Sequence, residues 1–303
     1  MKDAIQRIPV DYSANGRKAF WKVYIEVATL LLENSLDVLN EAESTHRPPQ
    51  LPTFVPDWHS RHPNSERFPL IFTAGIVESS QDFPSSVAIV GEALSVRGLL
   101  VGEIADTLPS YTPALNGTSN DFGPDGNAAR ILKVIEDASS KYKQYWPLVS
   151  SEAMAASLAR AWKMNALYRS ETESFQQYTG DIREDFLFVL KYLEWRKTGN
   201  LDIEVTRESA ERHLLPYMTH LRQINVGRRF IVTREGKIGL ASQSCKPGDS
   251  VCIFLEAKNP HILRKVENQD AFELIGAAYV DGMMDGEALS ASVANRLQNL
   301  KII

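Results

Sequence analysis

The sequence predicts an α+β protein with a helical central region and a small C-terminal module that is antiparallel and β-barrel-like. Two observations support this prediction. From Asn127 onward, apolar residues recur at helical spacing for about a hundred residues. After Asn225 the period changes to two, in short Val- and Ile-rich runs that Gly, Pro or Asn turns separate. We therefore expect a mainly helical domain at 1–225 and a small β module at 226–303.

The N-terminal part combines a helix, an irregular segment and a strand. An apolar stripe at helical spacing predicts a helix over 17–33. Residues 43–69 are rich in proline, which fixes φ and removes backbone donors, so no regular element is expected there. Because this segment also contains apolar residues, we expect it to be pinned against a core. A strand is predicted over 93–104, where apolar residues alternate.

The remaining elements follow from the two periodicities. Helices are predicted over 127–145, 151–169, 181–197 and 206–223. Strands are predicted over 228–233, 237–241, 250–255, 261–266 and 272–280. Five short strands at this spacing are typical of a compact antiparallel barrel or half-barrel.

The composition argues against several classes of partner and cofactor. The 33 basic and 38 acidic side chains leave a formal charge of −5, so we expect no nucleic acid partner. The most apolar window, 23–32, is too short to span a bilayer, and the polar N-terminal stretch predicts no signal peptide, so we expect a cytoplasmic protein. The two cysteines lack Cys-x-x-Cys spacing, and no carboxylate or cysteine at ligand spacing completes a metal site with His59 and His62. We therefore expect no metal site.

Sequence motifs near both ends of the chain resemble a known family. They are Val-Pro-Asp-Trp at 55–58, Gly-Arg-Arg-Phe-Ile-Val-Thr at 227–233, Gly-Lys-Ile-Gly-Leu at 236–240, Lys-Pro-Gly-Asp-Ser-Val-Cys at 246–252 and the segment 274–289. In these motifs the chain is similar to the C-terminal region of fungal heterokaryon-incompatibility (HET-type) proteins. Within that family a Toll-receptor-like HET domain precedes this region and drives a cell-death response. Because Met1 stands just before an Asp11-Tyr12 motif, we expect the chain to lack that domain.

The common catalytic signatures are absent from the sequence. There is no G-x-S-x-G elbow, P-loop, G-x-G-x-x-G after a strand, or H-E-x-x-H. We therefore expect no cofactor. A cofactor-free enzyme would act by holding an apolar substrate in a reactive conformation, which suits a pericyclic ring closure. The resemblance also implies a cyclase, since some stand-alone relatives of this region look like cyclases of terpenoid or polyketide intermediates. The sequence thus predicts an intramolecular [4+2], Diels–Alder-type cyclase with a hydrophobic small molecule as substrate.

Candidate site residues are polar groups and the aromatic residues of the Val-Pro-Asp-Trp segment and the helical centre. The polar, catalytic candidates are His59, Arg229, Tyr279 and Asp281. The candidates for the substrate wall are Trp58, Trp146, Trp162, Tyr168 and Trp195. Two structural alternatives stay open, because aromatic residues at helical spacing are commonly core residues. The second alternative is that Arg229 and Asp281 are not catalytic and form a structural ion pair between the first and last strands of the module.

Two further functional hypotheses compete with the cyclase. In the first, the chain is a non-enzymatic accessory or regulatory partner of full-length HET-type proteins. In the second, it is a scaffold without activity. Its partner would be a HET-type protein or a second copy of the chain in a homo-oligomer. A cyclase requires an enclosed apolar cavity between the helical centre and the β module. A packed interior with an apolar surface patch favours the binding partner instead.

Overall fold

A computed structural model describes ten stretches of the chain. They are residues 20–43, 47–59, 68–76, 87–110, 127–164, 166–169, 174–177, 191, 225–289 and 295–303. The helices within them are α2 (Phe20–Leu32), the 3₁₀ helix η1 (Leu36–Glu41), α3 (Asn127–Tyr145) and α4 (Ser151–Lys163). Apart from Lys191, the helices predicted over 181–197 and 206–223 lie outside the described residues, so they stay predictions. None of the described helices is long and apolar enough to cross a membrane.

Helix α4 ends earlier than the sequence predicts. The expected helix runs to residue 169, but Met164 adopts a left-handed conformation with φ 48° and ends the helix. The chain then continues as β3 (Ala166–Arg169), which forms a separate hairpin with β4 (Ser174–Gln177). Ser150 caps the other end, because its side chain accepts a hydrogen bond from the Ala153 N–H. The prediction for 151–169 is therefore wrong in its last third.

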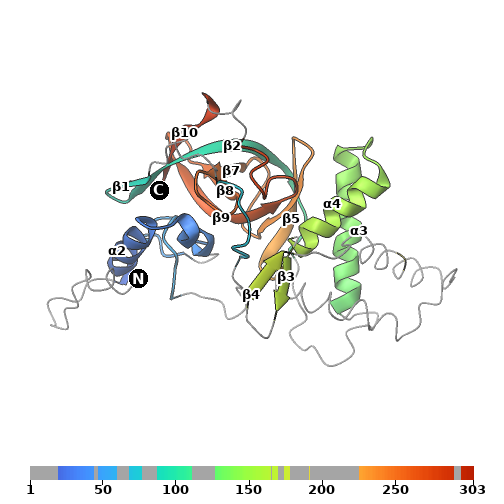
Figure 1. The fold of residues 1–303 in the computed structure, drawn as a ribbon, viewed down its shortest axis with the longest axis horizontal. Helices are drawn as coiled ribbons and strands as arrows, with labels where there is room; N and C mark the ends of the chain where they lie inside the picture. The colour runs from blue at the N-terminus through green and yellow to red at the C-terminus, as the bar shows by residue number, and fades with distance from the viewer. Residues whose placement is uncertain are drawn as a thin grey trace.

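Eight strands of the described chain form one mainly antiparallel sheet, arranged like a ring (Figure 1). They are β1 (Val87–Val90), β2 (Ala93–Thr107), β5 (Arg228–Thr233), β6 (Ile238–Ser242), β7 (Ser250–Phe254), β8 (His261–Lys265), β9 (Phe272–Val280) and β10 (Gln298–Ile302). Their order is β1-β2-β5-β6-β9-β8-β7, and β2 also pairs with β7, which closes the ring. The five strands predicted after residue 226 correspond to β5–β9. The sheet also includes β1 and β2, which precede that region.

Strand β2 closes the ring because it is long and bent. Along its 15 residues it pairs in turn with β10, β7 and β5. Two irregularities in its register, at Leu100/Gly102 and Ile104/Asp106, let it bend from one partner to the next. Gly98 allows the close approach of β7, since a Cβ there would lie 3.0 Å from the Ile253 carbonyl oxygen. With β1 included, strand β2 therefore pairs with four neighbours, and both bulges and Gly98 help it to do so.

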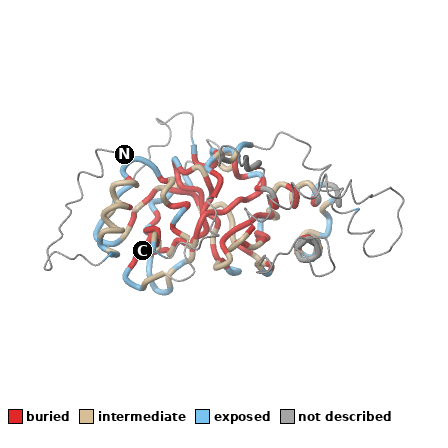
Figure 2. Tube along the Cα trace, turned by 90° about the horizontal axis from the view of Figure 1, so that it is seen from below, coloured by how far each residue is buried: buried red, intermediate tan, exposed pale blue. Residues whose placement is uncertain are grey.

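The buried residues form a central mass around the sheet, with helices at two ends (Figure 2; Figure 1). One apolar cluster joins α3 and α4 to β5, β6 and β9. A second joins α2, η1 and the proline-rich segment to β2, β7, β8, β9 and β10. A third lies among the sheet strands themselves. The two helical layers thus cover different parts of the sheet.

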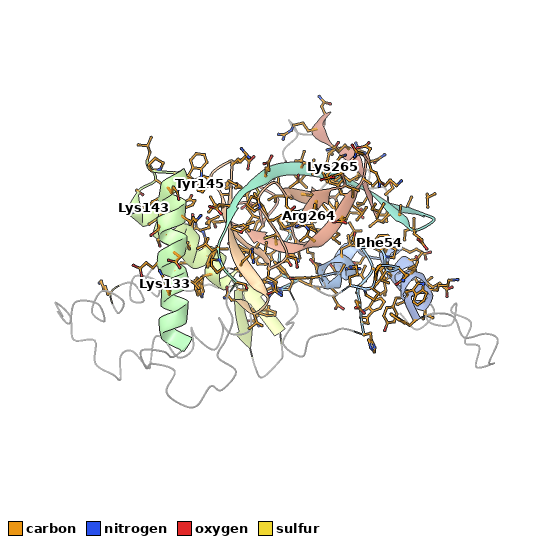
Figure 3. All side chains as sticks on the ribbon, turned by 180° about the vertical axis from the view of Figure 1, so that it is seen from behind. Phe54, Lys133, Lys143, Tyr145, Arg264 and Lys265 are labelled. Carbon is orange, nitrogen blue, oxygen red and sulfur yellow. The ribbon has the colours of Figure 1, made fainter. Side chains whose placement is uncertain are left out.

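The proline-rich segment packs against the core, as the sequence predicts for its described part. Leu51, Phe54 and Val55 are buried in the cluster that contains α2 and the sheet. Phe54 lies close to the N-terminal helices in Figure 3. The Thr53 N–H donates to the carbonyl of Ile303, and the Thr53 hydroxyl accepts from the Leu274 N–H at 2.9 Å. These bonds replace the regular pairing that proline prevents.

Candidate binding groove

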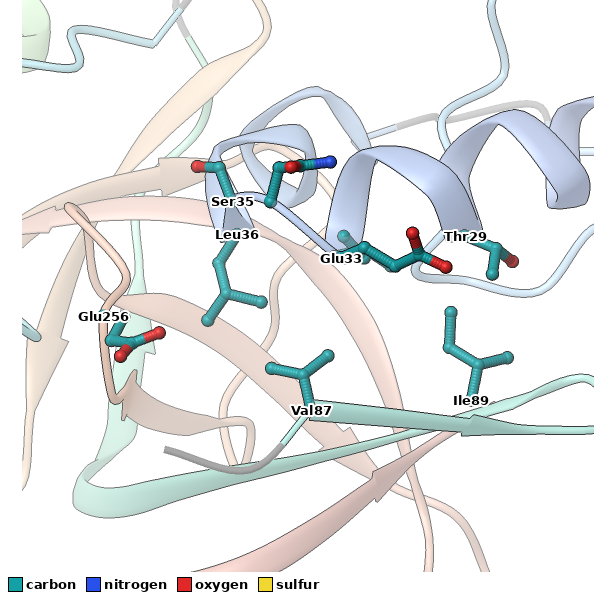
Figure 4. A pocket seen from close by; sticks show the side chains of 9 residues that line it. Thr29, Glu33, Ser35, Leu36, Val87, Ile89 and Glu256 are labelled. Atoms are coloured by element: carbon teal, nitrogen blue, oxygen red, sulfur yellow. The ribbon is translucent and has the colours of Figure 1, made fainter. Parts of the chain in front are cut away.

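A groove of about 560 Å³ lies between the N-terminal helices and strand β1 (Figure 4). It is open on one side. Its lining residues are Thr29, Leu32, Glu33, Asn34, Ser35, Leu36, Val87, Ile89 and Glu256. The apolar lining residues come from both walls. The polar lining residues include two carboxylates, Glu33 and Glu256.

Helix α2 and η1 form one wall through a sharp turn. Helix α2 ends at Leu32, and Ser35 starts η1 by accepting a hydrogen bond from the Asp37 N–H at 3.0 Å. This turn buries Leu32 and Leu36, which lie on either side of it. The ion pair between Asp37 and Lys258, at 2.7 Å, ties η1 to the turn after β7. The wall is therefore fixed to the sheet at its far end.

Strand β1 forms the opposite wall. It pairs with β2 through a two-residue turn that begins at Gly91, whose φ is +64°. Glycine suits this position because only it adopts such a φ without strain. Side chains alternate along a strand, so Val87 and Ile89 point into the groove (Figure 4), and Ala88 and Val90 point away.

Glu256 stands at one end of the groove, in the turn between β7 and β8. Its φ is +68°, a conformation that costs a residue with a Cβ about 1–2 kcal/mol. Its N–H donates to the Gly75 carbonyl at 2.8 Å, and the Gly75 N–H donates to the Ala257 carbonyl at 2.8 Å. A Cβ on Gly75 would lie 2.0 Å from the Phe254 carbonyl oxygen, so only glycine permits this contact. The close backbone contact thus determines where Glu256 projects.

The electrostatics of the groove favour a cationic ligand group beside an apolar one. Glu33 and Glu256 both line it. No ion pair of the Glu256 carboxylate is present in the described part of the chain, and the nearby Lys258 is engaged by Asp37. The apolar residues on the two walls would cover an aliphatic or aromatic group. No histidine or cysteine is among the lining residues, so the titratable side chains of the groove are the two carboxylates.

Three of the sequence-predicted site residues come together elsewhere, where α4 packs on the sheet. Trp162 is buried and lies against Phe230, with ring centroids 5.0 Å apart. Tyr279 is buried as well, with its hydroxyl 3.5 Å from an Asp281 carboxylate oxygen, and burial raises the pKa of this tyrosine. Trp162 and Tyr279 belong to the apolar cluster that joins α4 to β5, β6 and β9, and Asp281 lies next to it through its contact with Tyr279.

Asp281 pairs with Arg160 of α4, and the predicted pair with Arg229 is wrong. The Arg160 Nε and Nη2 groups donate to the two carboxylate oxygens at 2.6 and 2.8 Å. This bidentate bond raises the pKa of Arg160. Arg229 instead donates to the Thr107 hydroxyl at 3.3 Å, across the β2–β5 pair. The prediction fails because the sequence does not reveal which strand end α4 covers.

The other predicted residues are dispersed. Trp146 packs under Gly236, where a Cβ would lie 2.9 Å from its ring. Trp58 is half-buried edge-on to Tyr24 of α2, with centroids 5.2 Å apart, and His59 next to it is exposed. Tyr168 lies on β3, opposite Phe175, and its side chain is not described.

Trp195 lies outside the described residues. The described ones among these side chains do not line the groove. Among the described residues, no group of three or more His, Cys, Asp or Glu side chains is arranged to hold a metal ion.

Sequence reasoning did not identify the groove residues. The run Val87-Ala88-Ile89-Val90 followed by Gly91 is a hairpin signal that would have predicted β1. Glu256 has no such signal, because its left-handed conformation depends on the contact with Gly75, far away in the sequence.

Comparison with known proteins gives two matches. A family model described as the Het-6 beta-barrel domain matches residues 143–297, about half of the chain. The chain is also 22% identical over 264 residues to "Heterokaryon incompatibility protein 6, OR allele" of Neurospora crassa. That alignment covers 78% of this chain and 38% of the relative, so the chain spans well under half of the relative's length. No solved structure is significantly similar to the chain.

Proposed function

The chain belongs to the Het-6 beta-barrel domain family, and on that premise we propose that it is a non-enzymatic protein-binding module of the HET-type incompatibility system. Its proposed partner is a full-length HET-type protein. The observation that supports this proposal is the open groove between α2 and β1, whose lining combines four apolar side chains with hydroxyl and amide groups and two carboxylates. Such a combination suits side chains presented by another protein.

A cofactor-free cyclase, the other function expected from the sequence, finds less support. Folding a polyene into a reactive conformation requires an enclosed apolar cavity. The groove is open and has a carboxylate at one end. Of the catalytic candidates, Asp281 is engaged by Arg160, and Tyr279 is buried in the packed contact between α4 and the sheet. We therefore favour binding over catalysis.

The test is direct association between purified proteins. The full chain is titrated by calorimetry with each full-length HET-type protein encoded in the genome of its own organism. We expect a one-to-one complex with at least one of them, with a dissociation constant of about 1 μM or tighter. Absence of binding to every one of them, or turnover of an added polyene by the chain alone, would contradict the proposal.

A matched pair of variants connects the binding to the groove. Ile89→Arg places a long cation inside the groove, whereas Val90→Arg places the same cation on the opposite face of the same strand. Val90 is 75% exposed, so its replacement should not disturb packing. We expect the first variant to lose the partner and the second to keep it, with both variants folded at the temperature of the titration, although Ile89→Arg should melt lower because Ile89 packs against the α2 cluster. Equal binding by both would place the interface elsewhere.

A further inference from the structure

We infer that the groove binds an extended peptide segment of the partner, which adds to the outer edge of β1 as a new strand and places a basic side chain against Glu256. This inference rests on the proposed protein-binding function and specifies what part of the partner is recognised.

The backbone of β1 has the geometry that strand addition requires. The turn at Gly91 joins Val90 to Ala93, so these two residues form the hydrogen-bonded pair that closes the hairpin. Hydrogen-bonded and non-hydrogen-bonded pairs alternate along an antiparallel ladder. Val87 and Ile89 therefore belong to non-hydrogen-bonded pairs, and their N–H and C=O groups point away from β2. No other strand of the described chain pairs with β1.

The side chains of the same two residues line the groove. A strand added beside β1 would thus form main-chain hydrogen bonds with Val87 and Ile89. Its side chains on the groove face would extend the apolar wall under α2, at a spacing of about 6.6–6.8 Å for alternate residues. One extended ligand therefore contacts both the free backbone groups and the apolar walls.

The composition of β1 is unusual for an edge that stays in water. Its four residues are all apolar, and Val87 and Val90 are 36% and 75% exposed. Proteins generally protect sheet edges with charged residues, proline or a covering element, because bare edges pair with other chains. Strand β1 has no charge and no proline. An uncharged apolar edge beside a groove favours a partner strand as its occupant.

Glu256 indicates the charge of that partner. Glycine is the unstrained residue at its φ of +68°, so the glutamate is present despite backbone strain. Its carboxylate lies at the end of the groove where Leu36 and Val87 stand (Figure 4). A strand antiparallel to β1 passes Ile89 first and Val87 second. The expected motif is therefore two apolar residues at alternate positions, followed two residues later by Lys or Arg.

The probe for this inference is a fluorescein-labelled hexapeptide, Thr-Val-Thr-Val-Thr-Arg, with blocked ends. Binding to the full chain is followed by fluorescence anisotropy, and we expect a dissociation constant of about 1 mM or tighter. The same peptide with glutamate in place of arginine should bind roughly five- to tenfold more weakly. Glu256→Gln should weaken binding of the arginine peptide by a similar factor and should leave the glutamate peptide no weaker than before.

The main-chain bond is tested at Val87. Val87→Pro and Val87→Ala both remove the valine side chain, but only proline removes the outward N–H, and proline is tolerated at a strand edge. With equal melting temperatures, the proline variant should bind the arginine peptide roughly five- to tenfold more weakly than the alanine variant. Equal affinity of the two variants, or equal affinity of the two peptides, overturns the inference.

The outcomes separate this inference from the proposed function. If a HET-type partner binds the wild type and Val87→Pro equally well, strand addition is wrong and the proposed function stands. If the peptide binds with the expected specificity but no HET-type protein does, the inference stands and the proposed partner is wrong. If light scattering reveals a dimer that Val87→Pro dissociates, β1 pairs with a second copy, and the inference is overturned.

Discussion

The buried histidine at the start of β8 makes the stability of the fold depend on pH. His261 is fully buried beside the Phe254 ring, with centroids 5.0 Å apart, and stands opposite Cys252 in the sheet register. Neither ring nitrogen has a hydrogen-bond partner among the described residues. Burial therefore disfavours the charged imidazolium and lowers the pKa of His261 from 6.5 to about 4.

The direction and the size of the effect follow from this shift. At a pH between the two pKa values, His261 is protonated in the unfolded chain and neutral in the folded chain, so lowering the pH favours unfolding. The contribution of neutral His261 is fully present above pH 6.5 and is lost as the pH falls toward 4. A shift from 6.5 to about 4 corresponds to about 3 kcal/mol, lost at about 1.4 kcal/mol per pH unit.

The perturbation is His261→Leu, which keeps an apolar side chain of similar size and removes the titrating group. At pH 7 we expect unchanged or slightly greater stability, since a buried polar group without partners is removed. Urea unfolding is followed by tryptophan fluorescence from pH 4.5 to 7.5 in both proteins. Glu43 and Asp285, whose pKa values burial raises, act in the opposite direction but equally in both proteins. Their contribution cancels in the difference.

The difference between the two free energies of unfolding should change by about 1.4 kcal/mol per pH unit below pH 6.5. Parallel profiles for the wild type and the variant would refute the reasoning, because His261 would then titrate alike in the folded and unfolded chains. A large loss of stability at pH 7 would mean that the ring makes a hydrogen bond.

Two further perturbations test other parts of the structure. Arg160→Ala leaves the buried Asp281 carboxylate without its bidentate partner and should lower the free energy of unfolding by about 1–3 kcal/mol. Asp281→Asn on the same background should cost little more, and urea titration of the double-mutant cycle checks this coupling. Gly236→Ala combines a φ of +80° with a Cβ 2.9 Å from Trp146, so we expect a loss of about 1–3 kcal/mol. An unchanged melting temperature for that variant would show that Trp146 moves freely.

Local patterns were sufficient for much of the secondary structure. Apolar alternation and Gly or Asn turns predicted the strands that became β5–β9, because each alternating run has one side to bury and a turn to end it. The helices α2 and α3 match their apolar stripes for the same reason. The end of α4 was missed, since the left-handed conformation of Met164 has no marker in its residue type.

The candidate site depended on distant contacts and was therefore not predictable. Tryptophans and polar residues selected from the sequence proved to be core residues, surface residues or ion-pair partners. Asp281, for example, is separated by 121 positions from Arg160. The groove residues belong to three separate segments, and none of them has an unusual residue type. A search by residue type therefore finds reactive side chains more easily than binding surfaces.

By itself, the sequence determined the family and the positions of β2, β5–β9, α2 and α3, because these depend on motifs and on the periodicity of neighbouring residues. The tertiary structure decided the rest. It decided that β2 bends to pair with β5, β7 and β10 and closes the sheet into a ring. It also decided that α2 stands over β1 with a groove between them. The physical reason is that strand pairing and helix docking are set by complementary surfaces far apart in the chain, and no local pattern encodes which surfaces meet.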